Sequence, residues 1–191
     1  MREASYERKT GETEIRVAVN LDGTGQSDIR LPNSFLSHML SSMATHSLMD
    51  IKIEGDGDLT HHIVEDTALT LGEAMKMALG DRKGIRRFGD AMVPMDCSLA
   101  VAAVDLSGRP YSVVDLNLVG SMVEDCPSMD LRHFLVSLAT SMAASIHVNV
   151  QYGDDDHHKA EAAYKALSIA LRKAVETDPR RQGVPSSKGV L

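Results

Sequence analysis

The five-residue pattern His-His-x-x-Glu occurs twice in this chain, and the repeat constrains the fold more than any other feature. The first copy starts at His61 and the second at His157, 96 residues later. A random chain of this composition would contain about 0.02 copies, so even one is improbable. A second pair, His38 and His133, repeats after 95 residues. Because half of the 191 residues is nearly the same length, the spacing indicates an internal duplication.

The secondary structure expected from hydrophobic periodicity also repeats. Each half is expected to contain two strands, a helix, a third strand and a second helix. In the first half, a strand from Thr13 turns at Asp22-Gly23 and returns through 26–31. Helices are expected over 35–49, 62–79, 130–145 and 158–175. Two similar halves that arose by coincidence are the alternative to a duplication.

Two such units predict an α+β fold, because each apolar sheet face must be covered by helices. We expect internally duplicated ββαβα halves with the helices packed between two mixed four-stranded sheets. The Met- and Ala-rich helix sequences suit tight helix contacts in such an inner layer. The halves are expected at 1–90 and 91–178, followed by a C-terminal tail at 179–191, all within one compact domain.

Composition excludes several classes of function. A net charge of −7 argues against a general nucleic-acid binder. No apolar run approaches 18 residues, so no membrane span is expected. The N-terminal segment MREASYERKTGETE lacks the apolar stretch of a signal peptide. Cys97 and Cys126 are too few for a disulfide framework, which favours reduced thiols in a cytoplasmic protein.

Helix geometry turns the repeated motif into a prediction about metal. Residues four apart lie on one helix face, so His61 can share a cation with Glu65, and His157 can share one with Glu161. Neighbouring residues point about 100° apart, so each motif should serve two cations. The duplication then suggests a crossed pattern in which His158 joins the first pair and His62 joins the second.

His38 and His133 lie in matching helices, and each is expected to supply a fourth ligand to one of the two cations. Three imidazoles and one carboxylate suit a six-coordinate divalent ion with two positions open, and imidazole accepts Zn, Fe, Mn or Ni. A closed structural zinc site would usually include cysteine. His46 and His147 are expected to be ordinary core or surface residues.

The chain resembles the imidazoleglycerol-phosphate dehydratase family from about Arg8 to Leu191. The segments that carry this resemblance occur in order along the chain, and several are long. They are ETEIRVAVNLDGTG, FLSHML, HHIVEDTALTLGEA, KGIRRFG, PMD, DLSGRPY, HF, HHKAEAAYKALSIALRKA and DPRRQGVPSSKGVL. The family is similar in fold to the one expected above.

The resemblance implies two Mn²⁺ ions per active site and identifies their ligands. One ion would be held by His38, His62, His157 and Glu161, and the other by His61, Glu65, His133 and His158. The implied reaction is carbon–oxygen lysis in histidine biosynthesis, in which D-erythro-imidazole glycerol phosphate loses water to give imidazole acetol phosphate. The imidazole ring must act as the electron sink, and cations on both ring nitrogens would stabilise an imidazolate.

The resemblance also implies roles for residues outside the metal sites. Glu12 is the expected acid/base, although a strand-edge glutamate taken alone would be an ordinary exposed residue. The expected phosphate ligands combine arginine forks, an ammonium and hydroxyls: Arg87, Arg109, Ser186, Ser187 and Lys188. PSSKG is not a Walker loop, because the preceding glycine pattern is missing. The family's homo-oligomer of twenty-four chains, with sites between subunits, is expected here too.

This chain departs from the family pattern near the expected site. Cys97 follows Asp96 where the family has glutamate, and Ser37 replaces the aspartate before the helix histidine. The loop before His61 is short, with Leu59-Thr60 where two acids are usual, and Asp156 replaces an asparagine. All eight expected metal ligands remain, so these changes bear on fine tuning rather than on the reaction.

Two other functions are compatible with paired metals. One is a dinuclear metal hydrolase acting on a small phosphate ester, which would activate water. The other is a non-catalytic scaffold whose metals only join subunits. The dehydratase interpretation requires Glu12 for turnover, and the scaffold interpretation does not.

Overall fold

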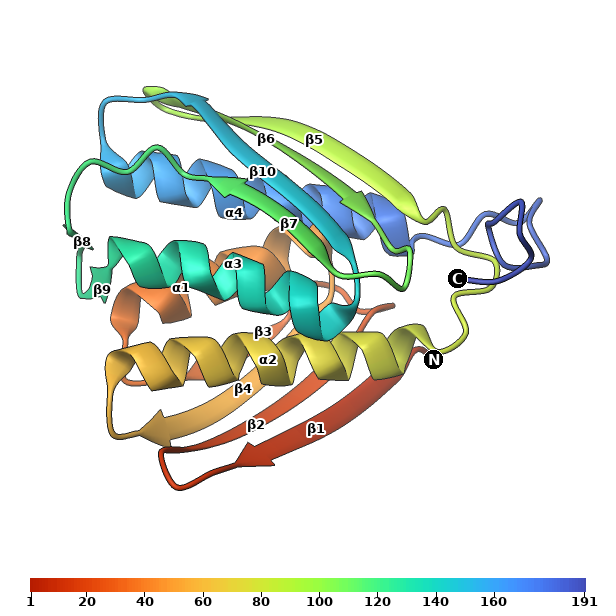
Figure 1. The fold of residues 1–191 in the computed structure, drawn as a ribbon, viewed down its shortest axis with the longest axis horizontal. Coiled ribbons are helices and arrows are strands. Elements are labelled where there is room, and N and C mark those ends of the chain that lie inside the picture. Colours follow the sequence, from red (N-terminus) through yellow and green to blue (C-terminus); the bar gives the residue numbers. More distant parts are fainter.

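The computed structural model describes all residues, 1–191, and consists of two sheets with four helices between them (Figure 1). The first half contains β1 (Glu3–Lys9), β2 (Thr13–Asn20), β3 (Ser27–Arg30), α1 (Ser34–Ser47), β4 (Asp50–Gly57) and α2 (Thr60–Leu79). The second half contains β5 (Phe88–Met95), β6 (Ser98–Asp105), β7 (Tyr111–Asp115), α3 (Ser128–Met142), β10 (Ser145–Tyr152) and α4 (Asp156–Val175). A small hairpin, β8 (Met122–Val123) and β9 (Cys126–Pro127), precedes α3.

The two halves have the same topology, which confirms the expected duplicated α+β fold. The first sheet has the order β1-β2-β4-β3 and the second β5-β6-β10-β7. In the first sheet β2 and β3 do not pair, because β4 lies between them. In the second sheet β10 lies between β6 and β7 in the same way. β3 pairs with β4 in parallel, and β7 pairs with β10 in parallel. The expected hairpin through Asp22-Gly23 is therefore wrong.

Each half also has one more strand than expected, giving the order βββαβα. The extra strands, β1 and β5, each pair with one neighbour only and lie at sheet edges. β1 is exposed along most of its length, and β5 carries Pro94 near its end, which an edge strand tolerates. Neither strand shows the alternation that predicts a half-buried strand.

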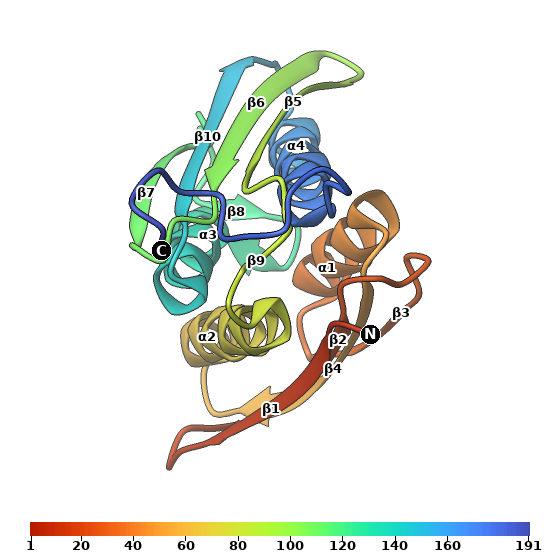
Figure 2. The same ribbon diagram turned by 90° about the vertical axis from the view of Figure 1, so that its right-hand side faces the viewer.

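The core lies in the helix layer and on the inner faces of the two sheets. α1 and α2 cover the first sheet, α3 and α4 cover the second, and the layers meet where α2 packs on α3 and α1 on α4 (Figure 2). Alternate residues of β2 point inward, namely Ile15, Val17 and Val19. α4 is buried nearly all round, and its alanines allow close approach to the strands above it.

Gly89 in β5 marks the closest of these approaches. A Cβ atom there would lie 1.9 Å from the carbonyl oxygen of Ala170 in α4. We expect Gly89→Ala to lower the free energy of unfolding by about 1–3 kcal/mol, since strand and helix must separate. Thermal unfolding of the metal-free protein measures this change. Gly183→Ala is the control, because nothing lies within 4 Å of its new Cβ. Equal unfolding temperatures for the two variants would contradict the packing described here.

The parallel course of the helices places the motif histidines together. The N-terminal ends of α2, α3 and α4 lie at one end of the molecule, and the chain termini and the C-terminal tail lie at the other (Figure 1). The helix layer thus brings both copies of His-His-x-x-Glu to one end. No helix is long and apolar enough to cross a membrane.

Candidate active site

Three of the expected ligands for one cation meet between α1 and α4. The Nε2 atom of His157 lies 3.5 Å from Glu161 Oε2, and the Nε2 atom of His38 lies 3.8 Å from the same oxygen. The ligand atoms of these three residues lie within 4.8 Å of one another. We call this group cluster A. One divalent cation bound by all three would fit this spacing.

A matching group, cluster B, lies between α2 and α3. It consists of His61, Glu65 and His133, whose ligand atoms also lie within 4.8 Å of one another. His133 Nε2 is 3.3 Å from Glu65 Oε1, and the rings of His61 and His133 stack with their centroids 5.0 Å apart. Neither His46 nor His147 belongs to a cluster. His147 lies beside Tyr111 on the outer face of the second sheet, and His46 lies in the last turn of α1.

The remaining expected ligands, His62 and His158, do not join either cluster within one chain. His62 Nδ1 lies 2.7 Å from Asp58 Oδ1, and this hydrogen bond raises the pKa of the imidazole. The rings of His61 and His62 are 6.2 Å apart, and those of His157 and His158 are 6.0 Å apart. Each motif therefore turns one imidazole into a cluster and the next one away from it.

Glu12 and Cys97 occupy matching places beside the outward-turned histidines. Each directly precedes the second strand of its half. Glu12 Oε2 is 3.7 Å from His62 Nδ1, and Cys97 Sγ is 3.5 Å from His158 Nδ1. The hydrogen bond with His158 lowers the pKa of Cys97 to about 7, with further help from backbone amides. The glutamate that the family resemblance leads us to expect at position 97 would correspond to Glu12 of the first half. This chain has the thiol of Cys97 there instead.

Two charged residues that sequence analysis did not single out contact the clusters directly. Asp130 Oδ1 lies 2.7 Å from His61 Nδ1, and Lys165 Nζ lies 2.7 Å from Glu161 Oε1. Burial alone would raise the pKa of Glu161, but Lys165, together with His38 and His157, outweighs burial, and the pKa is lowered. Helical spacing could have found Lys165, which follows Glu161 by four residues in α4, whereas the contact of Asp130 with His61 joins α3 to α2.

Arg87 and the C-terminal tail, which carry most of the expected phosphate ligands, lie at the opposite end of the subunit. The Arg87 N–H donates to the carbonyl oxygen of Ala174 near the end of α4. The Arg87 side chain pairs with Asp105 and donates from Nη1 to the carbonyl of Pro185, which anchors the tail. The backbone of Leu191, at the end of the tail, lies close to Gly108, the residue before Arg109.

The two ends of the subunit are too far apart for one small substrate. His157 is in the first turn of α4 and Ala174 in its last, and 17 residues of helix span about 25 Å. We call the end with the two clusters the metal end and the end with Arg87 and the tail the phosphate end, after the ligands expected there; the two ends do not meet within one subunit.

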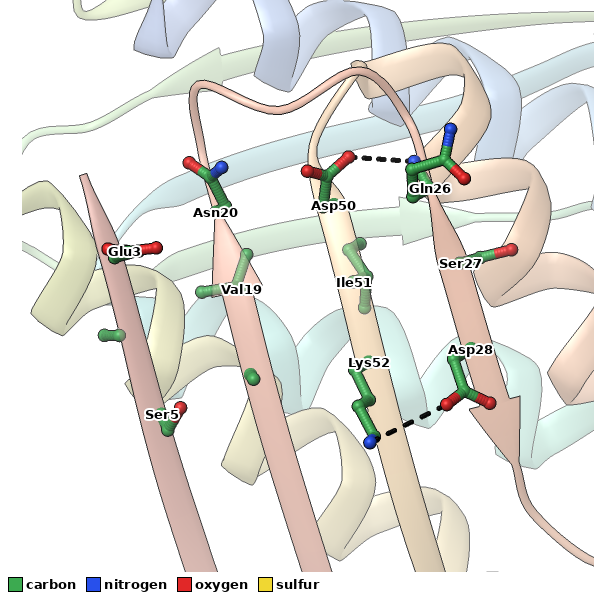
Figure 3. Close-up of a pocket in the computed structure, with 12 residues that line it drawn as sticks. Glu3, Ser5, Val19, Asn20, Gln26, Ser27, Asp28, Asp50, Ile51 and Lys52 are labelled. Atoms are coloured by element: carbon green, nitrogen blue, oxygen red, sulfur yellow. Dashed lines mark hydrogen bonds and ion pairs between the residues drawn. The ribbon is translucent and has the colours of Figure 1, made fainter. Parts of the chain in front are cut away.

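Two surface cavities help to locate the reactive end. A cavity of about 920 Å³ opens beside cluster B and is lined by His61, Asp130 and His133 together with residues 114–121. Another, of about 470 Å³, lies on the outer face of the first sheet (Figure 3). Two of its three acids are already paired, Asp50 with the backbone amides of Thr24 and Gln26, and Asp28 with Lys52. The second cavity contains no histidine and offers no comparable chemistry.

The fold and the paired clusters define a class: an internally duplicated α+β protein with two histidine–carboxylate clusters at one end of each subunit. Comparisons with known proteins specify it further. The profile of the family described as imidazoleglycerol-phosphate dehydratase matches residues 32–171. A protein of that name from Dehalococcoides mccartyi (strain CBDB1) is 52% identical over all of this chain and 97% of its own length. One from Methanothermobacter thermautotrophicus is 49% identical over all of this chain and 98% of its own.

Solved structures agree with these relatives. The Pyrococcus furiosus enzyme in complex with (S)-C348 has a TM-score of 0.84 at 36% identity and covers 97% of this chain and 99% of its own. The Staphylococcus aureus dehydratase has a TM-score of 0.83 at 29% identity and covers 91% and 99%. The chain belongs to the imidazoleglycerol-phosphate dehydratase family. It is therefore a hydro-lyase that carries out a dehydration in histidine biosynthesis.

Proposed function

We propose that this enzyme converts D-erythro-imidazole glycerol phosphate to imidazole acetol phosphate with two Mn²⁺ ions per active site, at sites shared between copies of the chain. The observation that carries this proposal is the incompleteness of each cluster. Each holds three ligands of an expected four, and the missing imidazole is turned outward from the same end of the subunit.

The donor chemistry accepts Mn²⁺ in both clusters, as it accepts Zn, Fe or Ni, and the family resemblance selects Mn²⁺ among them. Each offers two imidazoles and a carboxylate and no thiolate, which suits a divalent ion of intermediate hardness. His62 from a second copy would complete cluster A, and His158 from a second copy would complete cluster B. When bound, the two ions would act as Lewis acids that stabilise negative charge on the substrate's imidazole ring.

The chain's own residues supply proton transfer. Glu12 extends from the turn between β1 and β2, with its side chain more than half exposed, and lies beside His62. A carboxylate in this position can remove a proton from a substrate held at the metal end. Glu12 is therefore the proposed acid/base.

The opposite end of another copy would bind the substrate phosphate. Arg87 fixes the tail through Pro185, the residue before Ser186, Ser187 and Lys188, and the tail ends close to Gly108, the residue before Arg109. Two guanidinium groups, an ammonium and two hydroxyls provide several donors for phosphate oxygens. We propose that these ends meet in a closed homo-oligomer, for which the family suggests twenty-four chains, and that the enzyme works in the cytoplasm. No nucleic acid or membrane is a partner in this proposal.

A direct assay tests the function. Purified protein is incubated with Mn²⁺ and imidazole glycerol phosphate, and both the ketone product and free phosphate are measured. We expect imidazole acetol phosphate in proportion to enzyme, and its loss when Mn²⁺ is removed by chelation and dialysis. Release of phosphate without the ketone would instead identify a phosphoester hydrolase and overturn the proposal.

A further inference from the structure

Asp130 is a buried carboxylate whose side chain bonds to a single group, the ring of His61. Its side chain is 7% exposed, and the Oδ1 to Nδ1 distance is 2.7 Å. Burying a carboxylate is unfavourable unless a partner offsets the loss of water. A histidine that binds a metal usually donates its other ring N–H to such a carboxylate, which fixes the ring and strengthens it as a ligand. Asp130 holds Nδ1 of His61 in this way and leaves Nε2 for cluster B.

The internal duplication shows that cluster A lacks the equivalent group. Asp130 precedes His133 by three residues, and Phe35 precedes His38 by three. Phe35 contacts His157, the counterpart of His61, through a T-shaped ring contact with centroids 4.9 Å apart. His157 Nδ1 is instead 3.0 Å from Glu124, whose side chain is 61% exposed. An exposed carboxylate is largely solvated by water and contributes little to such a pair.

Lys165 adds a second difference between the clusters. Its ammonium binds one oxygen of Glu161, the carboxylate ligand of cluster A, and so draws negative charge away from it. The counterpart in cluster B, four residues after Glu65, is Leu69, which has no charge. Both differences therefore favour stronger cation binding at cluster B than at cluster A. Asp130 places a buried negative charge beside cluster B, and Lys165 places a positive charge beside cluster A.

We infer that Asp130 is a positioning residue for His61 and that it makes cluster B the tighter of the two cation sites. This inference rests on the proposed function, because it takes both clusters to be metal sites. Substitution of an outer carboxylate of this kind typically weakens metal binding about 10- to 100-fold. We expect that loss at cluster B alone when Asp130 is replaced.

Mn²⁺ titration of the full-length, metal-free protein tests the inference, with free Mn²⁺ followed by electron paramagnetic resonance. The wild type is expected to show two classes of site, each with one ion per chain. Glu65→Gln should remove the tighter class and Glu161→Gln the weaker one, which assigns the classes to clusters B and A. Asp130→Asn should weaken only the tighter class, by about 10- to 100-fold.

A matched control separates positioning from charge. Asp115→Asn removes one carboxylate from the wall of the same 920 Å³ cavity, but Asp115 bonds only to the backbone amide of Asn117. Both dissociation constants should stay unchanged in this variant. Asp130 also lies in the first turn of α3, where a carboxylate stabilises the helix, so a purely structural role would change the unfolding temperature without changing either dissociation constant.

Three results would overturn the inference: equal affinities in the wild type, unchanged constants in Asp130→Asn, or weakening of the class that Glu161→Gln removes. In each case the wild type still binds two Mn²⁺ per chain, so the proposed function stands. A wild type that binds no Mn²⁺ would overturn both the inference and the proposed metal chemistry.

Discussion

Replacing Glu12 with glutamine is expected to lower kcat for dehydration by about 10²- to 10⁴-fold, the usual contribution of a positioned acid or base. The amide keeps the size of the side chain but cannot accept or deliver the proton. Glu12 is not a member of either cluster, so Mn²⁺ content and assembly should not change. Steady-state kinetics, metal analysis and size-exclusion chromatography of the variant measure the three quantities.

Glu14→Gln is a suitable control for this substitution. Glu14 lies two residues after Glu12, in β2, and its carboxylate pairs with Lys9 and Arg16. Its loss should leave kcat unchanged. If Glu12→Gln retained full turnover with Mn²⁺ bound, Glu12 would not be the acid/base, and another group at the metal end would have to transfer the proton.

Mixing two inactive variants is expected to restore activity, because the proposed active site draws on more than one copy of the chain. Glu12→Gln damages the metal end, and Arg87→Ala damages the phosphate end by releasing the tail from Pro185. Both variants retain all eight expected metal ligands, so both should assemble. In a random one-to-one mixture, about one quarter of the sites would combine an intact Glu12 with an intact Arg87 from another copy.

The experiment requires the two variants to be mixed as separated subunits and then reassembled with Mn²⁺. We expect each variant alone to have very low activity and the mixed assembly to recover roughly one quarter of wild-type turnover. A mixture that stays as inactive as its components, although chromatography shows mixed assemblies, would contradict shared sites. It would also require both ends of one subunit to serve the same substrate across about 25 Å.

Most of the fold could be predicted from the sequence because the buried elements have clear periodicity. All four helices lie within a few residues of their expected ranges, and the inner positions of β2 alternate as expected. The edge strands β1 and β5 are not predictable from periodicity: β1 is largely exposed, and β5 buries Gly89 and Ala91 while it exposes Phe88 and Met92, so its polar and apolar residues do not alternate. The expected pairing of residues 26–31 with the strand from Thr13 is wrong as well. The strand that forms there, β3, follows β2 in the sequence but pairs with β4.

The site was predictable to the extent that helix geometry determines it. Spacing of four brought His61 to Glu65 and His157 to Glu161, and the duplication identified His38 and His133 as their companions. The role of Asp130 could not be read from the motif, because its contact with His61 depends on the packing of α3 against α2, whereas Lys165 lies one turn after Glu161 in α4. The distance between the metal end and the phosphate end could be found only from the three-dimensional structure. Sequence motifs do not show whether two groups of residues lie close together in one chain.

Anomalous diffraction at the manganese edge, from crystals of the assembled enzyme grown with Mn²⁺, tests the central claim most directly. We expect two peaks per chain, one within cluster A and one within cluster B. A second copy of the chain should complete each site, with His62 at the first and His158 at the second. Peaks absent from both clusters, or peaks whose ligands all come from a single chain, would contradict it.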